Sequence, residues 1–265
     1  MLPDTLPIEY KYPDRPDLTI YAVGDVHIGS QQFRESLWQD FVKRVTAEEN
    51  SRIVIVGDLI DNVTRSSVGS VFESTIRPSE QKKLAANYLA PLREKILCAV
   101  PGNHEARSGK DSDDSPLYDI LAKIDLEDVF RENEAFVKIC MGKQNGDGAK
   151  NPTYTIHASH GAGGGALTGG TVNRKERFAY TLEGIDVFFT GHDHKPFSTF
   201  PCRRVFDAHN MKIKEKPCVV LSCTSWLAYG GYSAQKMLPP TSFAPNAVIL
   251  KGMRKEIEYR ANLVF

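Results

Sequence analysis

The sequence predicts an α/β fold in a single domain that spans residues 1–265. Short runs rich in Ile, Val, Phe and Leu alternate with segments of helical periodicity over the first 105 residues. From about residue 196 the pattern changes to short strand-like segments separated by turns. A chain of 265 residues can also bury a large apolar core without a second domain.

The predicted strands of the N-terminal part are apolar runs that each end at a polar, glycine-containing turn. Such runs are typical of strands buried on both faces of a sheet, and they cover residues 18–23, 52–56, 96–100 and 185–190. Between the first two runs, apolar side chains recur with helical spacing at Leu37, Trp38, Phe41, Val42 and Val45. A second helix is expected to begin near Pro78. The order is therefore β-α-β-α-β, and the β-rich C-terminal half is expected to pack a second sheet on the first.

Charge and hydropathy exclude several classes of protein. Lys plus Arg and Asp plus Glu both number 33, so no overall field favours polyanions such as nucleic acid. A local basic patch is still compatible with these totals. No apolar run approaches the length that spans a bilayer, and the N-terminus lacks the pattern of a secretory signal. We therefore expect a cytoplasmic protein without membrane contacts.

Metal-binding residue types follow five of the strand-like runs. The turns are Gly24-Asp25-Val26-His27, Gly57-Asp58, Gly102-Asn103-His104-Glu105, Ser159-His160-Gly161 and Gly191-His192-Asp193-His194. Strand carboxyl ends of an open α/β sheet converge on one edge, so these side chains can surround one point. Five of the seven histidines lie in these turns. Carboxylate and imidazole together suit Mn, Fe or Zn, whereas a Mg or Ca cage would not need so much histidine.

Each turn alone has a simpler interpretation. A single Asp-x-His is more often a turn with a helix cap, and Gly102-Asn103 could be a tight turn that needs a positive φ. Histidines at i and i+2 can converge only in a loop, because they point to opposite faces of a strand. The occurrence of all five turns in order favours a metal site.

In this order the motifs resemble those of the calcineurin-like metallophosphoesterase family. The family pattern is Asp-x-His, Gly-Asp, Gly-Asn-His-Asp/Glu, His and Gly-His-x-His, and every element occurs between residues 24 and 194. The resemblance implies a four-layer α/β/β/α sandwich with two mixed β-sheets, the metallo-dependent phosphatase fold. The segment Asn62–Gln81 and the glycine-rich segment Gly161–Thr171 are also similar to those of family members encoded in phages and prophages.

The resemblance also implies two divalent transition-metal ions, Mn first and Fe, Zn, Ni or Co as alternatives. One ion would be bound by Asp25, His27 and His194, the other by Asn103, His160 and His192, and Asp58 would bridge the two. His104 would act on the leaving-group oxygen, with Asp61 orienting it. Asn103 and Arg107 are candidates for substrate binding, Arg107 because it follows Gly-Asn-His-Glu directly.

Such a centre suits the hydrolysis of a phosphate ester, which is anionic and repels hydroxide. Two ions ~3.5–4 Å apart lower the pKa of a bridging water and bind the phosphoryl oxygens, so the bridging hydroxide can attack in line. Because Asp25 and Asp58 are the only carboxylates among the proposed ligands, the site stays net positive and favours an anionic substrate.

Three functions remain open at this point. A phosphodiesterase acting on nucleic acid or a nucleotide is the first, because Gly24–Gly29 is similar to the opening motif of the family's DNA-repair nucleases. Those nucleases usually carry Asp where this chain has Glu105. A phosphomonoesterase, for proteins or small molecules, is the second. A metal-binding scaffold with little catalysis is the third.

Several further segments have two interpretations each. Gly161–Thr171 could present amides to phosphate or form a surface loop, and Asn173–Arg177 is more typical of a solvated helix face than of a phosphate contact. Asn62–Gln81 and Gly109–Ser115 are expected to be loops at the mouth of the site. Trp226, Tyr229 and Tyr232 could stack on a base, although packing is the more common role.

Overall fold

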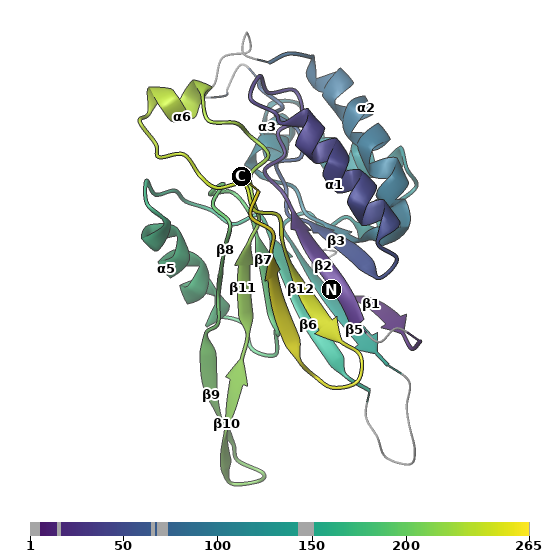
Figure 1. Ribbon diagram of the computed structural model, residues 1–265, viewed down its shortest axis with the longest axis vertical. Helices are drawn as coiled ribbons and strands as arrows, with labels where there is room; N and C mark the ends of the chain where they lie inside the picture. The colour runs from purple at the N-terminus through teal and green to yellow at the C-terminus, as the bar shows by residue number, and fades with distance from the viewer. Residues whose placement is uncertain (1–5, 15–16, 65–66, 68–73, 143–150, 265) are drawn as a thin grey trace.

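Two β-sheets that pack face to face form the centre of the molecule (Figure 1). The computed structural model describes residues 6–14, 17–64, 67, 74–142 and 151–264. In the described ranges no helix combines the length and the hydropathy needed to cross a bilayer.

The first sheet is five-stranded and contains the strands predicted near the N-terminus. Its spatial order is β13 (Ile257–Ala261), β12 (Asn246–Lys251), β2 (Asp17–Val23), β3 (Ser51–Ile55) and β4 (Ile96–Ala99). β2, β3 and β4 are parallel, whereas β12 is antiparallel to both β2 and β13. The sheet is therefore mixed.

The second sheet is six-stranded and also mixed. Its order is β1 (Ile8–Tyr12), β5 (Glu134–Met141), β6 (Thr153–Ser159), β7 (Val187–Thr190), β11 (Val219–Ser222) and β8 (Phe197–Thr199). β6, β7 and β11 run parallel to one another. β9 (Cys202–Asp207) and β10 (Lys212–Pro217) form a separate hairpin that projects at the bottom of Figure 1.

The C-terminal half supplies strands to the second sheet, as expected, and to the first sheet as well. β12 and β13 extend the first sheet, because β12 pairs with the free edge of β2, and β1 from the N-terminus completes the second sheet beside β5. Edge pairing of this kind joins segments far apart in the sequence, so local patterns do not reveal it.

Helices cover the outer faces of both sheets (Figure 1). On the first sheet lie α1 (Glu35–Ala47), α2 (Pro78–Leu89), the 3-10 helix η3 (Ala90–Lys95), α4 (Pro116–Ala122) and the 3-10 helix η4 (Glu127–Val129). On the second lies α5 (Thr168–Ala179), and two further helices, α3 (Asn103–Ser112) and α6 (Gly231–Gln235), lie near the upper end of Figure 1.

Alternate residues of the central strands serve different layers. In β2, Tyr21 and Val23 pack against the helices, whereas Ile20 and Ala22 pack between the sheets. Burial on both faces explains the continuous apolar run in the sequence. With Phe188 of β7 packed on the α5 side, the layers follow the order helix, sheet, sheet, helix. The α/β/β/α sandwich is thus confirmed.

Two of the segments predicted as loops contain helix. Gly109–Ser112 is the last turn of α3, and the residue that follows the helix, Asp113, has a φ of 54°. The Glu105 side chain caps the first turn of this helix, which continues into the acidic segment Gly109–Ser115. Pro78 opens α2, so the segment Asn62–Gln81 ends in helix, and residues 65–66 and 68–73 lie outside the described residues.

Candidate metal centre

The predicted metal ligands follow the carboxyl ends of parallel strands in both sheets. Asp25 and His27 follow β2, Asp58 follows β3, and Asn103 opens α3 after β4. His160 follows β6, and His192 and His194 follow β7. The parallel strands of both sheets end on the same side of the sandwich, so these turns face one another.

Unusual backbone geometry turns these side chains toward one another. Asp25, His27, Asp58, His192 and His194 have φ between 50° and 78°, and they make up five of the ten non-glycine residues with positive φ in the described ranges. Such a conformation is uncommon outside glycine and is found disproportionately at functional sites. It also allows the two histidines of the His-x-His pair to converge on the centre, since neither histidine lies in a strand.

Gly57 and Gly102 allow the turns after β3 and β4 to approach closely. A Cβ atom on Gly102 would lie 2.1 Å from Asp58 Oδ1, and one on Gly57 would lie 2.3 Å from the Gly102 nitrogen. Gly57 also has a φ of 86°. A larger residue would have to move Asp58 if placed at position 102, and the backbone of Pro101 and Gly102 if placed at position 57.

A first group of four side chains surrounds one point. Asp25, His27, Asp58 and His194 each offer a ligand atom, and these atoms lie within 4.8 Å of one another. His27 Nε2 is 3.1 Å from His194 Nε2 and 3.9 Å from Asp58 Oδ2, and His194 Nε2 is 3.8 Å from Asp25 Oδ1. Nitrogen and carboxylate atoms that converge in this way fit a divalent transition metal.

A second group shares Asp58 with the first. Asp58 Oδ2 lies 3.2 Å from His160 Nε2, and His192 Nδ1 lies 3.2 Å from the same nitrogen. Asn103 Oδ1 lies 2.8 Å from His192 Nδ1 and 3.1 Å from His160 Nε2. The structure thus brings the seven predicted ligands together in the two predicted sets, with Asp58 between them.

Hydrogen bonds to backbone groups orient two of the predicted ligands. His160 Nδ1 is 2.6 Å from the carbonyl oxygen of Val56, so this nitrogen carries the hydrogen and Nε2 is left for a cation. The backbone N–H of His192 donates to Asp25 Oδ1 at 3.0 Å. These contacts fix the tautomer of His160 and the direction of the Asp25 carboxylate.

The charge state of the imidazoles follows from burial and from Asp58. Burial lowers the pKa of His27 well below its usual value, as do the neighbouring rings of His104 and His194, so His27 is a neutral ligand. Burial also disfavours charge on His160, but Asp58 outweighs it and raises the pKa of His160 to about 9. A cation that binds His160 therefore has to displace a proton.

The predicted catalytic residues lie beside the first group. His104 Nε2 is 3.9 Å from Asp58 Oδ2, and His104 Nδ1 is 2.6 Å from the backbone carbonyl oxygen of Asp61. The Asp61 carboxylate itself lies 3.8 Å from His104 Nδ1 and 3.8 Å from His27 Nδ1, too far for a hydrogen bond to either. In this structure Asp61 therefore orients His104 through its main chain. Arg107 Nη1 lies 3.2 Å from His104 Nδ1.

Glu105 organises the Asp58 turn, a role that the sequence interpretation missed. Its buried carboxylate accepts hydrogen bonds from four backbone N–H groups, those of Gly102, Asp58, Leu59 and Ile60, at 2.7–3.1 Å. Burial, followed by the charge of Asp58, raises the pKa of Glu105. A capping-box pattern at the start of α3 was the available signal, but it predicts only the contact with Gly102.

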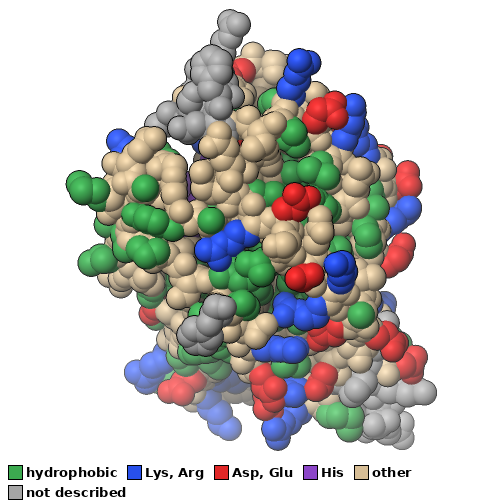
Figure 2. Space-filling model, turned by 45° about the horizontal axis from the view of Figure 1, so that its top comes forward, with side chains coloured by type: hydrophobic (Ala, Val, Ile, Leu, Met, Phe, Trp, Pro, Cys, Tyr) green, Lys and Arg blue, Asp and Glu red, His purple; other side chains and the backbone are tan. Residues whose placement is uncertain are grey.

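A cleft of about 610 Å³ opens over the predicted ligands, and the purple of a histidine side chain is visible inside it in Figure 2. Its walls include three cationic side chains, Arg34, Arg107 and Lys195, and the glycine-rich residues 163–166. On the α6 side, Tyr229 and Tyr232 line the cleft and are each 51% exposed, whereas Trp226 is buried in the core. Asp25 and His160 are buried beneath the cleft and do not line it.

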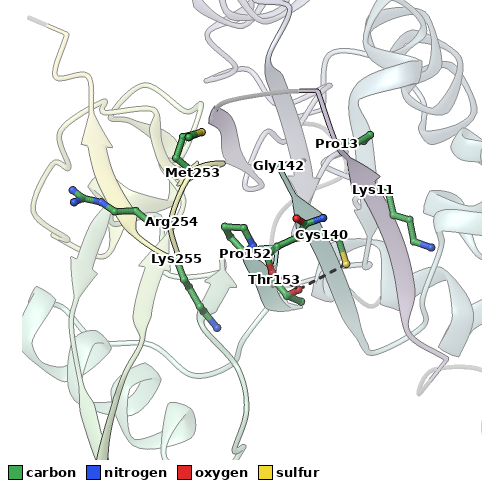
Figure 3. Close-up of a pocket in the computed structure, with 10 residues that line it drawn as sticks. Lys11, Pro13, Cys140, Gly142, Pro152, Thr153, Met253, Arg254 and Lys255 are labelled. Carbon is green, nitrogen blue, oxygen red and sulfur yellow. Dashed lines mark hydrogen bonds between the residues drawn. The ribbon is translucent and has the colours of Figure 1, made fainter. Parts of the chain in front are cut away.

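A second cavity, of about 840 Å³, lies at the opposite end of the sheets (Figure 3). It is lined by Lys11, Pro13, Cys140, Gly142, Asn151, Pro152, Thr153, Met253, Arg254 and Lys255. These described residues include no histidine and no carboxylate, so this cavity cannot hold the predicted metal centre.

Comparisons with known proteins identify the family of the chain. A family model described as calcineurin-like phosphoesterase matches residues 18–196. The chain is 31% identical over 103 residues to the DNA polymerase II small subunit of Methanothermobacter thermautotrophicus, covering 34% of this chain and 21% of that protein. It is 30% identical over 121 residues to the DNA polymerase II small subunit of Archaeoglobus fulgidus, covering 40% and 24%. The matches therefore span less than a quarter of these curated relatives.

Among solved structures, Chaetomium thermophilum Vps29 aligns with a TM-score of 0.41 and 11% identity, covering 94% of this chain and 97% of that chain. That similarity is too low to bear on function. The family model, by contrast, includes all five turns that carry the predicted ligands and more than half of the chain. The chain belongs to the calcineurin-like phosphoesterase family.

Proposed function

We propose that this protein hydrolyses phosphodiesters of nucleic acids or nucleotides with the help of two divalent transition-metal ions. The observation that carries the proposal is the position of Asp58, which belongs to both groups of ligand atoms and lies at the base of the cleft. Mixed carboxylate and imidazole ligands favour Mn, with Fe, Zn, Ni or Co as alternatives.

The ions, when bound, would neutralise the phosphoryl oxygens and make a water nucleophilic at neutral pH. The residues of the chain bind and orient the substrate. His104 Nε2 points toward the centre because Nδ1 is held by the Asp61 carbonyl group, so His104 can donate a proton to the departing oxygen. Asn103 and Arg107 line the cleft, which supports a role for both in contacting the phosphate.

The walls of the cleft support a diester substrate that carries a base. Arg34 and Lys195 add cationic charge beyond the ligands, and Tyr229 and Tyr232 present exposed rings on which a base can stack. The relatives are named as subunits of a DNA polymerase, which also favours a nucleic-acid substrate.

The choice between diester and monoester is tested by comparing bis(p-nitrophenyl) phosphate with p-nitrophenyl phosphate on protein loaded with Mn²⁺. We expect a higher kcat/KM for the diester, because Tyr229 and Tyr232 line the cleft and present exposed rings to its second aryl group. A preference for the monoester would instead identify a phosphomonoesterase. No turnover with Mn, Fe, Zn, Ni or Co would favour a metal-binding scaffold.

The variant His104→Ala is expected to keep its metal content and to lose turnover by about 10²–10⁴-fold, the usual contribution of a positioned acid. Metal analysis and initial rates measure the two quantities. His209→Ala is a matched control, since it removes an exposed histidine from the β9–β10 turn. If His104→Ala retained the activity of the parent protein, the acid would have to be another group.

Bound metal is expected to stabilise the fold. At a free Mn²⁺ concentration 100 times the Kd, binding contributes about 2.7 kcal/mol. For a chain of this size that raises the Tm by about 5–10 °C. Differential scanning calorimetry with Mn²⁺ and with EDTA measures the shift. Equal Tm values under both conditions would contradict metal binding by the folded protein.

A further inference from the structure

Lys175 is a buried cation at the back of the metal centre. It lies on α5, within the Asn173–Arg177 segment that the sequence assigns to a solvated helix face, but its side chain is only 5% exposed. Its ammonium group donates to the Gly191 carbonyl oxygen at 2.5 Å and to Ser222 Oγ at 2.9 Å. Asp193 Oδ2 lies 3.0 Å away as the ion-pair partner. The three protons of the ammonium thus face three acceptors.

Two of these acceptors belong to the loop that carries His192 and His194. Asp193 lies between the two histidines, and its carboxylate is 2% exposed and makes no hydrogen bond of good geometry in the described part of the chain, so Lys175 supplies its charge compensation. A buried carboxylate without a cation would be costly. The loop therefore depends on Lys175 for both a backbone and a side-chain contact.

The same loop holds its histidines in an uncommon conformation. His192 and His194 have φ of 78° and 57°, so the loop needs contacts that stabilise this geometry. The Gly191 N–H donates to the His160 carbonyl oxygen at 3.0 Å, and the Gly191 carbonyl oxygen accepts from Lys175. One histidine belongs to each group of ligand atoms, so a shift of the loop would disturb both groups.

We propose that Lys175 is a positioning residue, which holds the Gly191–His194 loop so that His192 and His194 can bind both ions at once. The proposal rests on the metal binding of the proposed function. It gives α5 a role at the centre, although no residue of this helix lines the cleft.

The test is the affinity of the metal-depleted protein for Mn²⁺, measured by isothermal titration calorimetry. Lys175→Met keeps an unbranched side chain and removes the ammonium group. We expect the Kd for Mn²⁺ to rise about 10–100-fold, as is usual when a group behind a metal ligand is lost. Arg177→Met is the matched control, because it removes an exposed cation from the same helix and should leave the Kd unchanged. An unchanged Kd in Lys175→Met would overturn the proposal.

The double variant Lys175→Met/Asp193→Asn separates positioning from general stability. It removes the buried carboxylate that the single variant leaves without a cation, so the midpoint of urea unfolding should recover. The Gly191 carbonyl oxygen still lacks its donor, so the Mn²⁺ affinity should stay low. Recovery of the parental affinity would overturn the proposal. If the parent protein itself bound no Mn²⁺, Fe²⁺, Zn²⁺, Ni²⁺ or Co²⁺, the proposed function would fail instead, which is a different result.

Discussion

The variant Asp58→Asn is expected to lose both the simultaneous binding of two metal ions and turnover. Asn can keep the backbone contact from the His104 N–H, which is 2.8 Å from Asp58 Oδ1, and it tolerates the φ of 52° at this position. It cannot supply a negative charge between the two groups of ligand atoms. Because loss of a single transition-state donor already costs about 10²–10³-fold, we expect kcat to fall by more than about 10³-fold.

Metal analysis and initial rates with bis(p-nitrophenyl) phosphate measure this effect. Asp119→Asn is a suitable control, because it removes the same charge from α4, where Asp119 pairs with Lys82 on the surface. Retention of full metal content and activity in Asp58→Asn would show that Asp58 is not the bridging ligand.

The variant Glu105→Ala is expected to destabilise the fold more than any surface substitution. It leaves four buried backbone N–H groups without their acceptor, and each such group costs about 1–3 kcal/mol. We expect the free energy of unfolding to fall by about 4 kcal/mol or more, a large part of the total of about 5–15 kcal/mol for a typical protein. Urea unfolding in EDTA measures this loss separately from any loss of metal.

Glu105→Gln should have an intermediate effect. Its single carbonyl oxygen replaces only one of the two oxygens that accept these bonds. Loss of the charge, however, removes both causes that raise the pKa of Glu105, the burial of the carboxylate and the repulsion from Asp58. Glu80→Ala, on the exposed face of α2, should change stability by less than about 0.5 kcal/mol. If Glu105→Ala unfolded at the same urea concentration as the parent, the carboxylate would not be organising the turn.

The local sequence pattern was sufficient to predict the central strands and the first two helices. β2, β3, β4 and β7 lie within the predicted apolar runs or within one residue of them, and α1 buries the predicted stripe. The layered arrangement came from the family resemblance, since periodicity does not show which sheet a strand joins. The pairing of β12 with β2 illustrates the limit, because the partners are more than 200 residues apart.

The ligand residues of the site could be predicted from the sequence because their chemical types recur directly after strands. The contacts that support these ligands could not be predicted. Lys175 carries nothing in the sequence to distinguish it from Arg174 or Arg177, and only its position on the inner face of α5 makes it buried. Glu105 was recognised as part of a motif, but three of the four N–H groups that it binds come from a turn more than 40 residues away.

The left-handed backbone conformation of five predicted ligands sets thermal stability against activity in this protein. The five are Asp25, His27, Asp58, His192 and His194. Each non-glycine residue in that conformation costs about 1 kcal/mol, which glycine would not. Laboratory selection for heat resistance alone, with metal withheld, is therefore expected to replace the partly exposed His192 and His194 with glycine, giving more stable chains that have lost activity. Selection that also demands turnover should leave these positions untouched and accumulate its gains elsewhere.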